Sequence, residues 1–348
     1  MTIAAHTAAQ HIVVDAESLR AAIIDALVAH GATPAKAEEQ AAMLVEGDLR
    51  DHHSHGVRRL PVLTARLDEG LIDSDSEPLF EWVTETILRV DGQQGFGPSV
   101  GFAAIDQIIE RAERTGLALA SISNSNHLGM LAPYVEKMVA AGQIAFAFTT
   151  SEALVHPWGG SSAMVGTNPI GIGVPTDGEP LILDMSTASV SMGKILDHAA
   201  KGEPIPLGWA VDSSGKPTDD AQAAVDGGAI SPFGGPKGYA LGIALEAIVA
   251  MLTQSSLGRE VAGTLDAKEL ANKGDVFIAI STKRLGLTSF LPRLQSYFDD
   301  VRASAAGGAS VSVPGDRARA TVEQRRRDGI PLLRANWDAA LELKEVAP

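Results

Sequence analysis

Apolar residues in the N-terminal part of the chain recur at the spacing of amphipathic helices. Leu19, Ile23 and Leu27 fall on one helical face. Asp15 before them can cap the helix, and Gly31 after them can end it. The same kind of pattern continues further along, so this part of the chain is predicted to be a helical subdomain. The expected helices are 15–31, 33–50 and 57–69.

From about Glu81 the pattern changes to short β-rich runs, separated by helical segments or glycine-rich turns. One of the helical segments, 237–252, is almost entirely apolar, so we expect it to be buried on most sides. After Pro314-Gly315 the chain returns to helical character, at 317–328 and 335–346. The middle of the chain is therefore predicted to mix α and β structure. The expected strands are Ile87–Val90, Leu117–Ser123, Ile144–Thr149, Ile170–Val174, Leu181–Leu183 and Val276–Ile280, and the expected helices among them are Phe102–Arg114, Ala132–Ala141 and Lys237–Leu252.

The composition is that of a folded, acidic protein. The 348 residues are 45% hydrophobic, which is enough to fill the cores of two or three domains. The net charge of −15 repels nucleic acids and anionic lipids. Cysteine is absent, which excludes disulfides, thiolate metal sites and thiol nucleophiles. Met1–Val14 has no basic start and no long apolar run, so we expect a cytoplasmic protein without membrane or nucleic-acid partners.

Two polar segments carry histidines. One reads Asp51-His52-His53-Ser54-His55-Gly56 and is followed by Arg58-Arg59; the other contains His127. Histidine is the side chain that most easily donates or accepts a proton near neutral pH. Three interpretations of the first segment stay open: a solvated helix end, a metal site, or acid/base catalysis by His55. In the third, Ser54 orients a substrate oxygen and Arg59 holds a carboxylate with its two parallel donors.

The usual nucleotide-binding motifs are missing. No Gly-x-Gly-x-x-Gly segment and no Walker loop occur, and 92–97 has the wrong glycine spacing. From the residues alone, nucleotide binding is not predicted. Lys237 at a helix start suits a phosphate, because the helix dipole and the ammonium both favour an anion. A capped turn with a surface lysine explains the same residues equally well.

A series of short segments nevertheless occurs in one order along nearly the whole chain: Ser54-His55-Gly56-Val57, Asn124-Ser125-Asn126-His127, Gly166-Thr167-Asn168-Pro169, Leu183-Asp184-Met185-Ser186-Thr187, Lys237-Gly238-Tyr239 and Pro314-Gly315. In these segments the chain resembles the non-Rossmann malate/L-lactate dehydrogenase family. That family also includes ureidoglycolate and sulfolactate dehydrogenases, 2,3-diketo-L-gulonate reductase and the cyclic imino-acid reductases. Several ordered matches are more specific than any single one.

The resemblance implies an α+β fold in two domains. A helical domain is formed by both chain ends, 1–78 with 314–348, and residues 79–313 form an α+β NAD(P)-binding domain. The sheet of the second domain is expected to be non-Rossmann and largely antiparallel, which would account for the missing glycine motif. The resemblance also implies a homodimer in which residues of both subunits lie near NAD or NADP.

The resemblance further implies roles for single residues. His55 matches a histidine taken as proton donor in some members, and His127 matches one taken as proton acceptor in others. Ser54 and Thr167 resemble substrate-orienting hydroxyls, and Arg59 resembles the clamp for the substrate carboxylate. The positions that match cofactor contacts are Ser151, Asp184, Met185, Ser186, Lys237, Gly315, Asp316 and Arg317.

The predicted function is an NAD(P)-dependent oxidoreductase that moves a hydride between nicotinamide and a small 2-hydroxy acid or 2-keto acid, like malate or lactate, without a metal. Asp51, His53 and Leu63 depart from residues usual in the family, so the substrate is not carried over. Lys194 looks more like the hydroxy-acid dehydrogenases than the NADPH-dependent cyclic imino-acid (piperideine/pyrroline-2-carboxylate) reductases. Two alternatives of other classes remain. They are a metal-dependent phosphoesterase, suggested by the Asp-His-His run at 51–53, and a non-catalytic binding protein.

Overall fold

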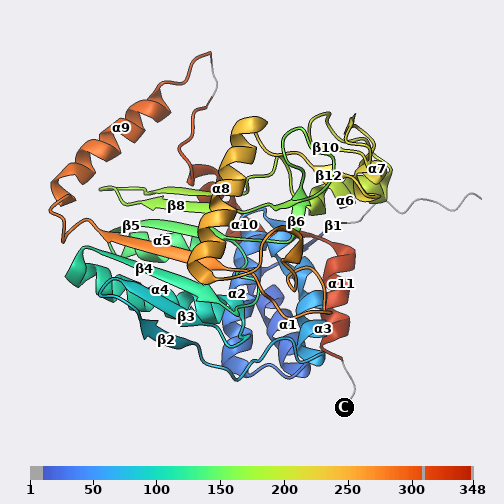
Figure 1. The fold of residues 1–348 in the computed structure, drawn as a ribbon, viewed down its shortest axis with the longest axis horizontal. Helices are drawn as coiled ribbons and strands as arrows, with labels where there is room; N and C mark the ends of the chain where they lie inside the picture. Colours follow the sequence, from blue (N-terminus) through green and yellow to red (C-terminus); the bar gives the residue numbers. More distant parts are fainter. Residues whose placement is uncertain (1–10, 308–309, 346–348) are drawn as a thin grey trace, which may run out of the picture.

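A seven-stranded sheet forms the centre of the protein (Figure 1), in a computed structural model that describes residues 11–307 and 310–345. Its strands are β2 (Leu79–Trp82), β3 (Ile87–Asp91), β4 (Leu117–Ser123), β5 (Gln143–Thr149), β8 (Ile170–Val174), β9 (Leu181–Met185) and β13 (Asp275–Ser281). They lie in the order β2-β3-β4-β13-β5-β8-β9. All neighbours run antiparallel except β3 and β4, which are parallel. This arrangement differs from the parallel sheet of the doubly wound nucleotide-binding folds.

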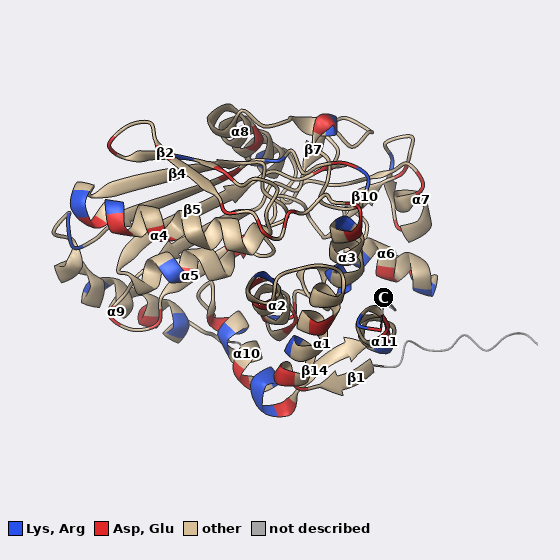
Figure 2. Cartoon of the chain, turned by 90° about the horizontal axis from the view of Figure 1, so that it is seen from below, with Lys and Arg blue, Asp and Glu red and all other residues tan. Residues whose placement is uncertain are grey.

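Three helices cover the two faces of this sheet. They are α4 (Gly97–Thr115), α5 (Ala132–Ala140) and α8 (Pro236–Thr253). Figure 2 shows α8 on the side of the sheet opposite to α4 and α5. The main core lies between α4, α5 and the sheet, where Ile105, Tyr134 and Phe277 are fully buried. Each such side chain contributes about 1.5–3 kcal/mol to folding through the apolar area it removes from water.

A helical part lies below the sheet and is made from both ends of the chain. It contains α1 (Ala16–Ala29), α2 (Pro34–Leu49), α3 (Leu60–Asp68), α10 (Asp316–Asp328) and α11 (Arg334–Leu343). Asp15 caps α1 by accepting from the Ser18 amide at 2.9 Å. Strand β1 (His11–Val14) pairs antiparallel with β14 (Ile330–Leu333), so the two ends of the chain meet in one small sheet. Whether this part is a separate domain with boundaries at 78 and 314 remains a prediction.

A smaller lobe completes the molecule. Its five-stranded sheet has the order β11-β10-β12-β6-β7 and is accompanied by two helices and its own apolar cluster, which includes Val155, Ile195 and Ile230. The lobe and the helical part face each other across the end of the large sheet. Its elements are β6 (Ala153–Val155), β7 (Val165–Gly166), β10 (Ala210–Val211), β11 (Pro217–Thr218), β12 (Ala229–Ile230), α6 (Met192–Lys201) and α7 (Ala221–Val225).

The structure corrects several expectations about the helices. The prediction that 237–252 is buried on most sides is wrong, because Ile248 is 48% and Met251 80% exposed. Among the described residues, nothing covers the exposed outer face of this helix. The predicted helix 57–69 begins as a 3-10 turn at Val57–Arg59, and α4 starts before Phe102 because Pro98 suits a first helical turn. Sequence patterns missed α6 and α9 (Leu291–Ala303), and Val346 of the predicted last helix lies outside the described residues.

Candidate active site

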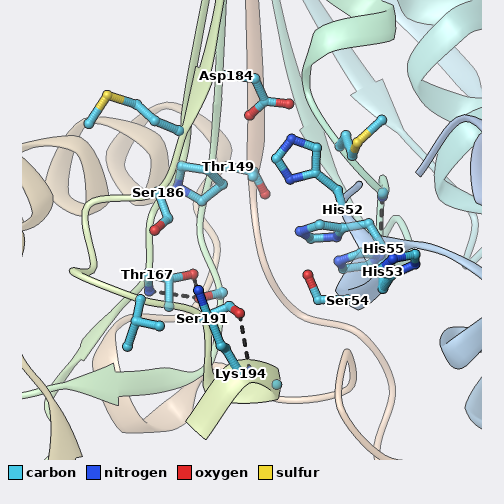
Figure 3. A pocket seen from close by; sticks show the side chains of 18 of the residues that line it. His52, His53, Ser54, His55, Thr149, Thr167, Asp184, Ser186, Ser191 and Lys194 are labelled. Atoms are coloured by element: carbon cyan, nitrogen blue, oxygen red, sulfur yellow. Dashed lines mark hydrogen bonds between the residues drawn. The ribbon is translucent and has the colours of Figure 1, made fainter. Parts of the chain in front are cut away.

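A cleft of about 680 Å³ opens between the helical part, the end of the large sheet and the small lobe. Figure 3 shows His52, His53, Ser54 and His55 on one side of it, and Thr167, Ser186, Ser191 and Lys194 facing them. Its volume is in the range of small-molecule and cofactor sites. The cleft thus brings together polar side chains from segments that are far apart in the sequence.

The turn after α2 delivers the histidine run to the cleft. Asp48, at the end of α2, is 1% exposed and accepts from the Val57 amide and from Nδ1 of His53, both at 2.7 Å. A Cβ on Gly56 would lie 2.2 Å from the Asp48 carboxylate, so only glycine fits there. The buried carboxylate therefore holds the turn in the shape that directs Ser54 and His55 into the cleft.

The second histidine arrives from the loop after β4. The rings of His55 and His127 stack nearly parallel, with centroids 5.3 Å apart and planes 9° apart. Burial, with the positive charge of Arg59 added, lowers the pKa of His55 to about 3 and that of His127 well below its ordinary value. Both rings are therefore neutral near pH 7, the state in which an imidazole has one donor and one acceptor nitrogen.

Asn126 holds the loop that carries His127. Its side chain is 1% exposed, and its amide donates to the Gln94 carbonyl at 2.7 Å and the Gly95 carbonyl at 3.2 Å. Its Oδ1 accepts from Arg66 at 3.1 and 2.9 Å. A Cβ on Gly97 would lie 2.2 Å from the His127 carbonyl, so α4 begins directly against this loop. The loop is fixed from several sides.

The opposite wall contains the hydroxyls and the carboxylate that the resemblance singled out. The Thr167 amide donates to the Ser151 hydroxyl at 2.9 Å, and the two hydroxyls lie 3.1 Å apart. Asp184 accepts from the Leu131 and Ala132 amides at 2.8 Å each, at the start of α5. Burial raises the pKa of Asp184. Ser151, Thr167, Asp184, Met185 and Ser186 all line the cleft.

A second cavity of about 350 Å³ continues the cleft. Gly315 and Arg317, at the start of α10, line it. Four residues line both cavities: His52, Met130, Asp184 and Arg317. The two cavities therefore form one elongated site, with the stacked histidines in the larger part and the start of α10 in the smaller part.

Arg59 does not lie where the clamp prediction needs it. It does not line the cleft; its guanidinium donates to the Thr264 carbonyl, and within the described residues its buried Nε has no partner. Its neighbour Arg58 lines the cleft instead and pairs with Asp197 of α6 at 2.9 Å. The 3-10 turn at 57–59 points the two adjacent arginines in different directions.

Two predicted cofactor residues also lie outside both cavities. Lys237 is exposed on the first turn of α8. The Asp316 carboxylate bonds Arg302 at 2.8 and 3.0 Å and also pairs with Arg319, which holds its pKa well below the usual range. Asp316 therefore ties α9 to the start of α10, and within this chain neither residue reaches the cleft.

The sequence reasoning missed two charged residues, Lys273 in the cleft wall and Asp48 behind the histidine turn. Lys273 lines the cleft at 2% exposure, and its ammonium bonds both oxygens of Asp275 at 2.6 and 2.5 Å. Lys273 and Asp275 are two positions apart in an extended segment, so their side chains lie on the same side of it. This spacing is the signal in the sequence that could have identified the pair. Asp48 was likewise missed, because its role depends on a turn that folds back onto it.

The metal interpretation finds no support in the part of the chain that the structure describes. No group of three or more His, Asp or Glu side chains there is arranged to hold a metal ion. His53 instead lies between Asp48 at 2.7 Å and Asp51 at 3.3 Å. Its two nitrogens are therefore both engaged by carboxylates.

Comparison with known proteins gives consistent matches over nearly the whole chain. The sequence profile described as malate/L-lactate dehydrogenase matches residues 14–340. The malate/(S)-sulfolactate dehydrogenase of Methanothermus fervidus is 34% identical over 97% of each chain. A Δ1-pyrroline-2-carboxylate/Δ1-piperideine-2-carboxylate reductase of Pseudomonas aeruginosa is 33% identical over 94% of this chain and 98% of its own. The crystal structure of a dehydrogenase from Sinorhizobium meliloti superposes with a TM-score of 0.92 at 42% identity, covering 96% of this chain and 98% of that one.

Proposed function

The chain belongs to the malate/L-lactate dehydrogenase family, and we propose that it transfers a hydride between a nicotinamide cofactor and C2 of a small 2-hydroxy acid or 2-oxo acid. The observation that carries the proposal is the pair of neutral histidines, stacked 5.3 Å apart on the wall of a cleft. Oxidation of a secondary alcohol requires a group that takes the hydroxyl proton while hydride leaves carbon. A neutral imidazole is suited to that task.

The elongated site fits a dinucleotide cofactor. Arg317 lines both cavities and forms no ion pair among the described residues, so its guanidinium is available for a phosphate. Ser151, Met185 and Ser186 offer polar and apolar contacts along the cleft wall. When bound, the nicotinamide supplies or accepts the hydride. Whether NAD or NADP is used is tested by comparing kcat/KM with NADH and with NADPH.

In this proposal the hydroxyls of Ser54 and Thr167 orient the substrate from opposite walls. Both line the cleft. Orientation of this kind lowers the barrier because the reacting carbon and the hydride acceptor are held in line. Arg59 serves as the carboxylate clamp only if the Thr264 carbonyl that it now bonds is displaced by the substrate.

A cyclic imino-acid reductase is the second candidate, favoured by the 33% identical Pseudomonas relative. Lys194 argues for the oxo-acid reaction instead. It lines the cleft with its ammonium 5.0 Å from the Trp209 ring, and a protonated cyclic imine would be repelled there. We expect Lys194→Glu to shift the ratio of kcat/KM values toward cyclic imines. An unchanged ratio would remove this argument.

The direct test follows NAD(P)H absorbance with purified protein and a panel of 2-oxo acids and cyclic imines. We expect turnover of at least one 2-oxo acid, and a loss of at least about a hundredfold in His55→Ala and in His127→Ala. Cofactor binding without any turnover would favour the non-catalytic alternative. Stoichiometric bound manganese or zinc in the purified protein would favour the phosphoesterase alternative.

We also propose a homodimer, with the outer face of α8 against a second copy. Ile243, Ile248 and Met251 are 43%, 48% and 80% exposed on that face. The helix is apolar and long enough to cross a membrane by composition alone, but its inner face carries Glu246, which accepts from Asn168 at 2.7 Å within the protein.

Light scattering tests this interface. We expect Met251→Asp to shift the protein toward a monomer, whereas Leu207→Asp, at a 70% exposed apolar residue of the small lobe, leaves the mass unchanged. If Met251→Asp and Leu207→Asp were both monomeric, or both dimeric, the result would argue against α8 as the interface. A cytoplasmic location is proposed as well, and cell fractionation tests it.

A further inference from the structure

The two stacked histidines differ in what their Nδ1 atoms contact. Nδ1 of His127 accepts from the backbone N–H of Gly129 at 3.1 Å. A backbone N–H can only donate, so this nitrogen carries no proton, and the proton of the neutral ring must be on Nε2. In the described part of the chain, the buried Nδ1 of His55 has no partner. The tautomer of His127 is therefore fixed, whereas that of His55 is not.

The Gly129 amide cannot easily turn away from His127. Gly129 has a φ of 84°, and a Cβ there would lie 2.5 Å from Cγ of Met43. On one side of it, the Leu128 carbonyl accepts from the buried Tyr134 hydroxyl at 2.6 Å. On the other, the Leu131 amide is held by Asp184 at 2.8 Å. The loop thus keeps this N–H directed at the imidazole.

The charges around His127 oppose a second proton on the ring. His55 faces it from the helical part as its stacking neighbour, and Arg59 adds a positive charge from the same turn. Lys273, two residues before β13, adds another, although Asp275 pairs with it. Together with burial, these groups lower the pKa of His127. A protonated Nδ1 would also place its N–H against the N–H of Gly129.

We propose that His127 is a fixed neutral hydrogen-bond donor to the oxygen on C2 of the substrate, and that His55 alone exchanges the proton with that oxygen. This inference rests on the proposed function. In oxidation, the O–H bond of the alcohol breaks, its proton goes to His55, and its electron pair forms the C=O bond. The C2–H bond breaks with its electron pair, which leaves as hydride to the oxidised nicotinamide. The Nε2–H bond of His127 stays intact and stabilises the negative charge that develops on the oxygen.

The first test reads the tautomer directly, without turnover. Nitrogen-15 NMR of histidine-labelled protein distinguishes a protonated from an unprotonated ring nitrogen, and the His127 signal is assigned from its loss in His127→Gln. We expect His127 to show an Nε2–H, neutral pattern from about pH 8 down to about pH 5. An Nδ1–H pattern, or titration of His127 within that range, would overturn the proposal.

The second test compares matched variants. His127→Gln keeps an amide N–H near the position of Nε2, so we expect it to retain turnover within about tenfold of the wild type, with the same pH profile of kcat. His127→Leu, of similar size but without a donor, should lose at least about a hundredfold. At His55, Gln and Leu should be equally inactive, since neither exchanges a proton. Equal loss in both His127 variants would make His127 a proton carrier and overturn the assignment.

Failure of the proposed function has a different signature. In that case the wild-type protein turns over no 2-oxo acid or cyclic imine with either cofactor. The NMR measurement of the His127 tautomer does not depend on turnover, so it can still give the expected Nε2–H pattern. An Nδ1–H tautomer in a protein that does turn over a 2-oxo acid would reject the inference alone.

Discussion

The turn that carries His55 and the loop that carries His127 face the same cleft, but they are held differently. The turn depends on the buried Asp48 carboxylate, with one bond to a backbone amide and one to His53, and on Arg325, which donates to the Asp48 carbonyl and pairs with Asp51. The loop depends on Asn126, whose amide group is engaged by two carbonyls and by Arg66. The loop held by a buried neutral amide presents the histidine to which we assign a fixed donor. The turn held by carboxylates and Arg325 presents the one to which we assign proton exchange.

The comparison is tested most severely at Asn126. Asn126→Ala leaves the buried Arg66 guanidinium and the Gln94 and Gly95 carbonyls short of partners. We expect the free energy of unfolding to fall by about 3 kcal/mol, measured by urea denaturation. Gln107→Ala removes an exposed amide from α4 and should change it by less than about 0.5 kcal/mol. If Asn126→Ala lost no more unfolding free energy than Gln107→Ala, Asn126 would not be what holds the loop.

A smaller effect is expected on the other side, from Asp48→Asn. The amide oxygen still accepts from the Val57 N–H, but the NH2 group can only donate to His53, whose Nδ1 must then be unprotonated, so we expect a loss of about 1–2 kcal/mol of stability. Displacement of His55 should lower kcat/KM by about tenfold or more, while the NMR signal of His127 stays unchanged. If the His127 signal moved as well, the two segments would be coupled rather than separately supported.

A third expected effect concerns pH, and here the two histidines should act alike. Their pKa values are lower in the folded protein than the ordinary value of about 6.5, so below that pH the unfolded chain binds protons that the folded chain does not. Stability is therefore fully present above about pH 6.5 and falls as the pH decreases, by up to about 1.4 kcal/mol per pH unit for each histidine. Urea denaturation at several pH values measures the slope. His127→Gln should remove the contribution of one histidine to this slope of unfolding free energy against pH. An unchanged slope would mean that His127 is not desolvated.

Local signals in the sequence were sufficient for much of the fold. Asp15 caps α1 as expected, because a cap depends only on residues three positions apart. The strands at 117–123 and 144–149 were found because short apolar runs that follow a glycine are local features too. The exposed face of α8 was not predictable. The apolar composition predicts that the helix is covered, but it does not tell whether the same chain or a second copy covers it.

The candidate site was less accessible to sequence reasoning. The approach of His55 to His127 across the fold follows from no periodicity, and the family resemblance suggested it. Which of Arg58 and Arg59 faces the cleft depends on the pitch of a three-residue 3-10 turn. Asp316 was misassigned because Arg302 of α9 binds its carboxylate, in addition to Arg319 in the same helix. Such choices are made by tertiary contacts rather than by local pattern.

The pairing of β1 with β14 has a consequence for how the protein is made. Residues 11–14 form their strand pairing with residues 330–333. During synthesis the first strand therefore cannot pair until almost the entire chain has left the ribosome. The large sheet, whose strands lie between residues 79 and 281, can assemble before that point. We therefore expect chains that terminate before residue 330 to retain the sheet but leave the helical part unfinished, exposing its apolar faces to chaperones and proteases.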